Sequence, residues 1–84
     1  MTSPALTKAL ELAPIIERVH GAHHPELTRV RELTESLAQD GADTDAVFRE
    51  LREVTADFAI PDDVCETFVS VYESLEQVEG ESKA

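Results

Sequence analysis

Four stretches of this chain repeat apolar residues at intervals of three and four, the spacing that lines one face of an α-helix. The first stretch runs from Pro4 to Val19, and Ser3 is placed to cap it. Pro14 interrupts the pattern and predicts a kink or a restart, because proline removes a backbone donor and clashes with the preceding turn. The apolar positions of this stretch are Leu6, Leu10, Ala13, Ile16 and Val19.

Three further helices are expected after the natural stop at Gly21. The second begins at Pro25 and ends at Asp40-Gly41, the third begins at residues 43–44 and ends before Pro61, and the fourth begins at Pro61. Their apolar faces carry Leu27, Val30, Leu33 (or Thr34) and Leu37; Val47, Phe48, Leu51, Val54 and Phe58; and Val64, Cys65, Phe68, Val71 or Tyr72, Leu75 and Val78.

The connections between these stretches are short, so neighbouring helices should run antiparallel. We therefore expect an all-α fold, a small up-down bundle of three to four short helices, which a second copy could complete. A chain of 84 residues makes one domain, which we place at residues 1–79, followed by a disordered tail at 80–84. A domain this small buries only about 60–65% of its unfolded surface, so association would stabilise it.

The charge is strongly negative, with 18 acidic residues against 7 basic ones and a net charge of −11. Such a surface repels nucleic acids and anionic membranes, which excludes both as partners. Two explanations remain: an acidic patch for a basic partner, or a halophilic protein of a salt-rich cytoplasm, where self-repulsion is screened. We favour the second, because the acidic residues are spread along the chain and lysine is scarce.

Cysteine content and the N-terminal sequence indicate a cytoplasmic protein. Cys65 is the single cysteine, so no intramolecular disulfide can form. The opening residues MTSPALTK lack the apolar run of a signal peptide. No stretch approaches the roughly 20 apolar residues that a membrane helix needs.

Three histidines lie within five positions, at His20, His23 and His24. Imidazole binds iron and zinc, and Glu26 could add an oxygen, so these four residues form a candidate metal site. The alternative is a polar loop with solvated histidines, which we favour because a metal site needs three or four convergent ligands.

The remaining chemistry-bearing residues give little support for catalysis. Cys65 occupies an apolar-stripe position, so we expect it buried and inert; a reactive Cys–His pair would require the fold to bring a histidine to it. Glu17 and His20 form one Glu-x-x-His spacing, whereas di-iron bundles use two with further carboxylates. No glycine-rich phosphate loop is present. We predict that the chain is not an enzyme.

Two runs in the chain resemble the hemerythrin-like di-iron proteins that repair iron–sulfur clusters. One is IERVHGAHHPEL at residues 16–27, with its VHG..HPEL core. The other is FAIPDDVCETF at residues 58–68, which continues through Tyr72, Leu75 and Glu79. The runs occur in the same order as in that family and cover somewhat under half of the chain. Val64 departs from the alanine of the family pattern.

The resemblance implies a four-helix bundle in which His20 matches an iron ligand and His24 matches the second histidine of the same element. Cys65 matches a cysteine of the family, for which we assign no role. Both His-x-x-x-Glu segments that supply the bridging carboxylates are missing, so one chain cannot hold the family's complete di-iron site. The resemblance therefore indicates a truncated relative.

Two functional hypotheses follow. The first is a non-catalytic module derived from this family that self-associates as a homodimer or binds a protein partner. The second is a protein that binds iron or zinc through His20, His23, His24 and Glu26, with His20 and His24 of two copies meeting across a dimer, in iron–sulfur or stress metabolism. An acidic surface that binds a basic partner is a third, weaker idea.

Overall fold

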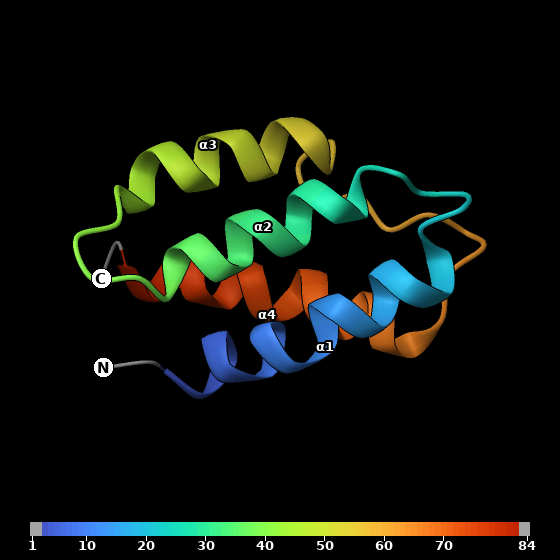
Figure 1. Cartoon of the computed structure of the whole chain (residues 1–84), viewed down its shortest axis with the longest axis horizontal. Helices are drawn as coiled ribbons and strands as arrows, with labels where there is room; N and C mark the ends of the chain where they lie inside the picture. The colour runs from blue at the N-terminus through green and yellow to red at the C-terminus, as the bar shows by residue number, and fades with distance from the viewer. Residues whose placement is uncertain (1–2, 83–84) are drawn as a thin grey trace.

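The chain folds as four helices joined by short irregular segments in the computed structural model, which describes residues 3–82 (Figure 1). The helices are α1 (Pro4–His20), α2 (Leu27–Leu37), α3 (Thr44–Val54) and α4 (Glu66–Ser82), and the described residues contain no strand. Successive helices run in opposite directions, α1 packs against both α2 and α4, and α3 packs against α2. The predicted all-α, up-down helical bundle is confirmed.

The core lies where the apolar faces of the four helices meet. Tyr72, Phe68 and Ile16 are the largest of its fully buried side chains. Most of the predicted stripe positions are buried, including Leu6, Ala13, Leu27, Val30, Leu33, Phe48, Leu51, Val71, Leu75 and Val78. Thr34 is also fully buried, and its hydroxyl donates to the Val30 carbonyl at 2.7 Å, which satisfies its polar group inside the helix.

Helix α1 runs from its cap to His20 without a break, so the predicted restart at Pro14 was wrong. Pro14 lies on the exposed side of the helix, where water can reach a carbonyl that has lost its helical donor. Val19 was predicted to face the core but is 60% exposed. The buried face of α1 instead ends at Ile16, three residues earlier.

Two glycines and one serine set the helix boundaries. Ser3 Oγ accepts a hydrogen bond from the Leu6 amide at 3.2 Å, which confirms it as the cap of α1. At Gly21, a Cβ atom would lie 2.3 Å from the Glu17 carbonyl oxygen, so the end of α1 has no room for a side chain. Gly41 has φ +79°, a conformation that glycine adopts without strain, in the turn before α3.

Helix α3 ends at Val54, four residues short of its predicted apolar face. Ala56, Asp57 and Phe58 all have positive φ, between 53° and 61°, which turns the chain out of the helix. Such a run is costly for residues with a Cβ atom. Thr55 supports it: its hydroxyl donates to the Leu51 carbonyl at 2.6 Å and accepts from the Phe58 amide at 2.9 Å. The buried Phe58 side chain therefore belongs to a residue of this turn and not to a helix.

The first residues of α2 and α4 also differ from the predicted ones. Helix α2 begins at Leu27 rather than Pro25, because residues 21–26 form turns in which the Leu27 amide donates to the His24 carbonyl at 3.0 Å. Helix α4 begins at Glu66 rather than Pro61, since residues 59–65 form the connection from the left-handed turn.

At its far end α4 continues to Ser82, three residues beyond the predicted domain boundary at 79. Val78 and Glu79 are still buried there, so packing holds the last turns in place. Of the predicted disordered tail, residues 83–84 lie outside the described part of the chain.

Candidate functional site

The residues singled out from the sequence gather at one end of the bundle. The connections 21–26 and 55–65 both lie there, at the end opposite the start of α1 and the last turn of α4 (Figure 1). His20 is the last residue of α1, His24 lies in the following connection, and Cys65 immediately precedes α4. The up-down topology therefore brings together two segments that are about half the chain apart in sequence.

Cys65 is exposed and pairs with His20, so its predicted burial was wrong. The Cys65 Sγ and His20 Nε2 atoms lie 3.2 Å apart. The hydrogen bond with His20, followed by those with the backbone amides of Phe68 and Thr67, lowers the pKa of the Cys65 thiol to about 7. Thiolate is the reactive and metal-binding form of cysteine, and this arrangement makes it accessible near neutral pH.

His24 is held by two carboxylates, one from each connection. Its Nε2 atom lies 3.1 Å from Asp63 Oδ1, and its Nδ1 atom lies 3.2 Å from Glu26 Oε2. The hydrogen bond with Asp63, together with the weaker effect of Glu26, raises the pKa of His24 and outweighs the opposing effect of burial. The same hydrogen bond lowers the pKa of Asp63. His24 therefore ties the two connections together.

The imidazoles of His20 and His24 both pack against the ring of Phe68, which belongs to the core. The centroid of the fully buried Phe68 ring lies 5.7 Å from that of His20 and 5.6 Å from that of His24, in edge-to-face geometry. The Phe68 and Tyr72 centroids are 4.6 Å apart. Burial is the main cause that raises the pKa of the Tyr72 hydroxyl above its ordinary range. The site is thus positioned by the hydrophobic core.

Of the four predicted metal ligands, His24 and Glu26 are in contact, but the four do not converge on one point. His20 pairs with Cys65, His24 pairs with Glu26 and Asp63, and His23 is exposed. Within residues 3–82, no group of three or more His, Cys, Asp or Glu side chains could hold a metal ion. The sequence interpretation missed Asp63. Nothing in its spacing links it to a histidine 39 positions earlier.

A second feature lies along the outside of α1. Ile15 is 39% exposed and Val19 is 60% exposed, and both are among the exposed large apolar residues of the described chain. Leu12 is half-buried beside them. Residues 12, 15 and 19 follow helical spacing, so they form one apolar row on the outer face of α1. We call these three residues the α1 row.

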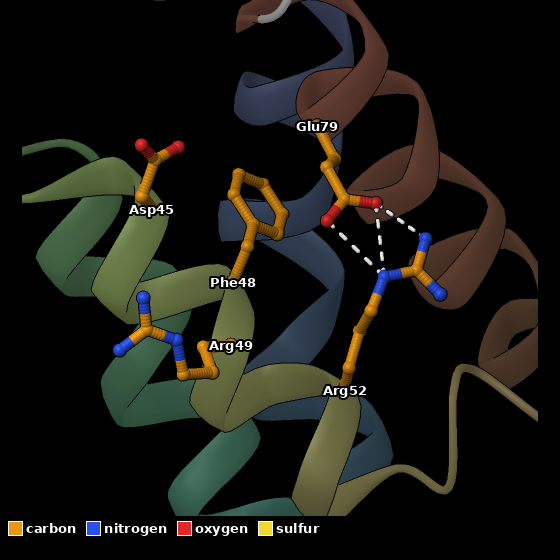
Figure 2. A pocket seen from close by; sticks show the side chains of 5 residues that line it. All are labelled: Asp45, Phe48, Arg49, Arg52 and Glu79. Atoms are coloured by element: carbon orange, nitrogen blue, oxygen red, sulfur yellow. Dashed lines mark hydrogen bonds and ion pairs between the residues drawn. The ribbon is translucent and has the colours of Figure 1, made fainter.

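A pocket of about 370 Å³ separates α3 from α4, lined by Asp45, Phe48, Arg49, Arg52 and Glu79. Figure 2 shows Arg52 reaching from α3 toward the buried Glu79 of α4. The Arg52 Nε atom donates to both Glu79 carboxylate oxygens at 3.1 Å, and its guanidinium lies 5.2 Å from the centre of the Phe58 ring. The Arg52–Glu79 pair joins two helices that otherwise have little contact.

Comparison with known proteins adds no relative. No family model, curated protein or solved structure matches the chain. The likeness to hemerythrin-like repair proteins therefore rests on the two sequence runs alone. Within residues 3–82, every helix falls short of the length and apolar character needed to cross a bilayer.

Proposed function

We propose that this chain is a non-catalytic helical module that associates with a second copy of itself through the outer face of α1. The observation that carries the proposal is the α1 row, whose Ile15 and Val19 side chains are exposed on an otherwise acidic chain. Burial of such side chains in a partner releases water and favours association. A small domain gains most from this, because its own core is limited.

Charge does not oppose the approach of two copies at α1. This helix carries Lys8 and Arg18 against Glu11 and Glu17, so it is neutral in a chain with a net charge of −11. Glu17 is also paired with Arg31 of α2 at 2.7 Å. Helix α4 would repel another copy, since it carries five acidic residues and no basic ones: Glu66, Glu73, Glu76, Glu79 and Glu81.

The interface should be small. One helix face buries less than the roughly 1,200 Å² typical of stable complexes, so we expect a dissociation constant on the order of 100 μM. Multi-angle light scattering at increasing protein concentration measures it. Ile15→Glu and Val19→Glu should each weaken the dimer at least about tenfold, because each would bury a charge without a partner.

Ile60→Glu is the matched control. Ile60 is 42% exposed, close to the value for Ile15, but it lies in the 55–65 connection and not on α1. Its substitution should leave the dimer unchanged. Equal weakening by Ile60→Glu and Ile15→Glu would contradict an interface on α1. Circular dichroism of each variant establishes that the helices are intact.

We also propose an evolutionary origin and a cellular setting for the chain. The two runs that resemble hemerythrin-like repair proteins support descent from their four-helix bundle, with the metal chemistry lost and the bundle kept. The acidic composition supports a salt-rich cytoplasm as the place of action.

Metal binding is the second candidate function, and the His20–Cys65 pair is the observation that favours it. One chain supplies two adjacent donor atoms, a nitrogen and a sulfur 3.2 Å apart. Zinc sites of the tetrahedral N₂S₂ type would need two more donors from another chain. This candidate requires two copies to meet at the end of α1 rather than along it. Zinc titration of the unmodified chain and of Cys65→Ser tests it; absence of zinc-dependent association would exclude it.

A further inference from the structure

The charged residues beside the α1 row determine how a second copy can lie on it. Glu11 and Arg18 are both exposed. At 100° per residue, positions 11 and 18 fall on the same side of the row, toward solvent, while the half-buried Leu12 lies on the side toward the core. One edge of the row is therefore polar and carries one acidic and one basic residue, a little over two helical turns apart.

This pattern is self-complementary in one orientation. If two α1 helices run antiparallel about a two-fold axis at Ile15, residue 11 of one copy lies beside residue 18 of the other, on the same side of the interface. Leu12 of each copy then packs near Val19 of its partner. A parallel two-fold arrangement would place the polar edges of the two copies on opposite sides of the interface, so Glu11 would not meet Arg18 of its partner.

We propose that two copies of this chain pair through antiparallel α1 helices centred on Ile15, with Glu11 of each copy facing Arg18 of its partner. This inference rests on the proposed self-association and adds its orientation and register. The pairing buries the α1 row of both copies. It leaves the five-glutamate helix α4 of each copy, which packs on another side of α1, away from the interface.

Charge exchange tests the polar contacts. In about 0.2 M KCl, where contacts between neighbouring charges persist, Glu11→Lys should weaken the dimer about three- to tenfold, because it opposes Arg18 with a second cation in both symmetric pairs. Adding Arg18→Glu should restore the dissociation constant to within about twofold. A double variant as weak as the single one would overturn the assigned contact.

Cysteine substitution tests the register independently. In a Cys65→Ser background, Ile15→Cys should form an interchain disulfide on mild oxidation, because residue 15 meets its own copy at the axis. Val19→Cys should not, since four residues on each side of the axis separate its two copies by about 12 Å. The reverse pattern would overturn the register and favour pairing at the end of α1.

These results separate the two claims. If Ile15→Glu abolishes association but charge exchange and the cysteine pattern disagree with this register, self-association through α1 stands and the antiparallel arrangement fails. If Ile15→Glu has no effect on association, both fail.

Discussion

Replacement of Phe68 by alanine should destabilise the fold more than any conservative change on the surface of α4. Phe68 is fully buried, and its ring contacts the rings of Tyr72, His20 and His24. Truncation of a buried phenylalanine costs about 3–5 kcal/mol through lost transfer energy and the cavity left behind. A domain of 84 residues has about 4–13 kcal/mol of stability in total, so this change removes a large share of it.

Urea unfolding followed by circular dichroism measures the effect. With a slope of about 1 kcal/mol/M, the transition midpoint should fall by about 3 M or more, or the variant should be unfolded without urea. Val69→Ala provides the control, because Val69 is the half-buried neighbour and should cost about 1 kcal/mol or less. Both proteins are compared at one concentration, since association adds to stability. A Phe68→Ala variant within about 1 kcal/mol of the unmodified chain would refute the packing of the site on this ring.

Four further outcomes are expected. Gly21→Ala should cost about 1–3 kcal/mol in thermal unfolding, because its Cβ would meet a carbonyl oxygen, whereas Gly80→Ala, with open space around its Cβ, should not destabilise. Glu17→Gln should lower the urea midpoint at pH 7, and this difference should shrink as the solution is made acidic: Thr28 and Arg31 lower the pKa of Glu17, so its contribution is present above the unfolded pKa and is lost as the pH falls through the folded pKa. In metal-free buffer, the alkylation rate of Cys65 should rise with a midpoint near pH 7, and His20→Ala should move that midpoint toward about 8.5. Removal of salt should reduce helical circular dichroism and the melting temperature; no change would contradict salt adaptation.

The number and order of the helices could be predicted from the sequence because apolar spacing is a local property. Prolines and glycines located the connections to within a few residues. Val19 shows the limit of this approach: its spacing continues the stripe, but the core that covers Ile16 does not extend to the next turn of the helix. The exposed row on α1 became visible only once the packing of its neighbours was known.

The turn after α3 and the site residues depend on contacts between distant segments. Ala56, Asp57 and Phe58 adopt positive φ without the glycine or asparagine that marks such turns in a sequence. Cys65 meets a histidine 45 positions away, and the stripe that suggested its burial begins, in the structure, with Phe68 instead. Spacing along one helix carries no information about this turn or about the contact between Cys65 and its histidine.

Sedimentation equilibrium of the unmodified, reduced chain, over roughly 10 μM to 1 mM in about 0.5 M KCl, tests self-association most directly. A reversible monomer–dimer equilibrium is expected, shifted toward monomer by Val19→Glu. A single monomeric species up to the highest concentration would contradict the assignment of the α1 face to a second copy.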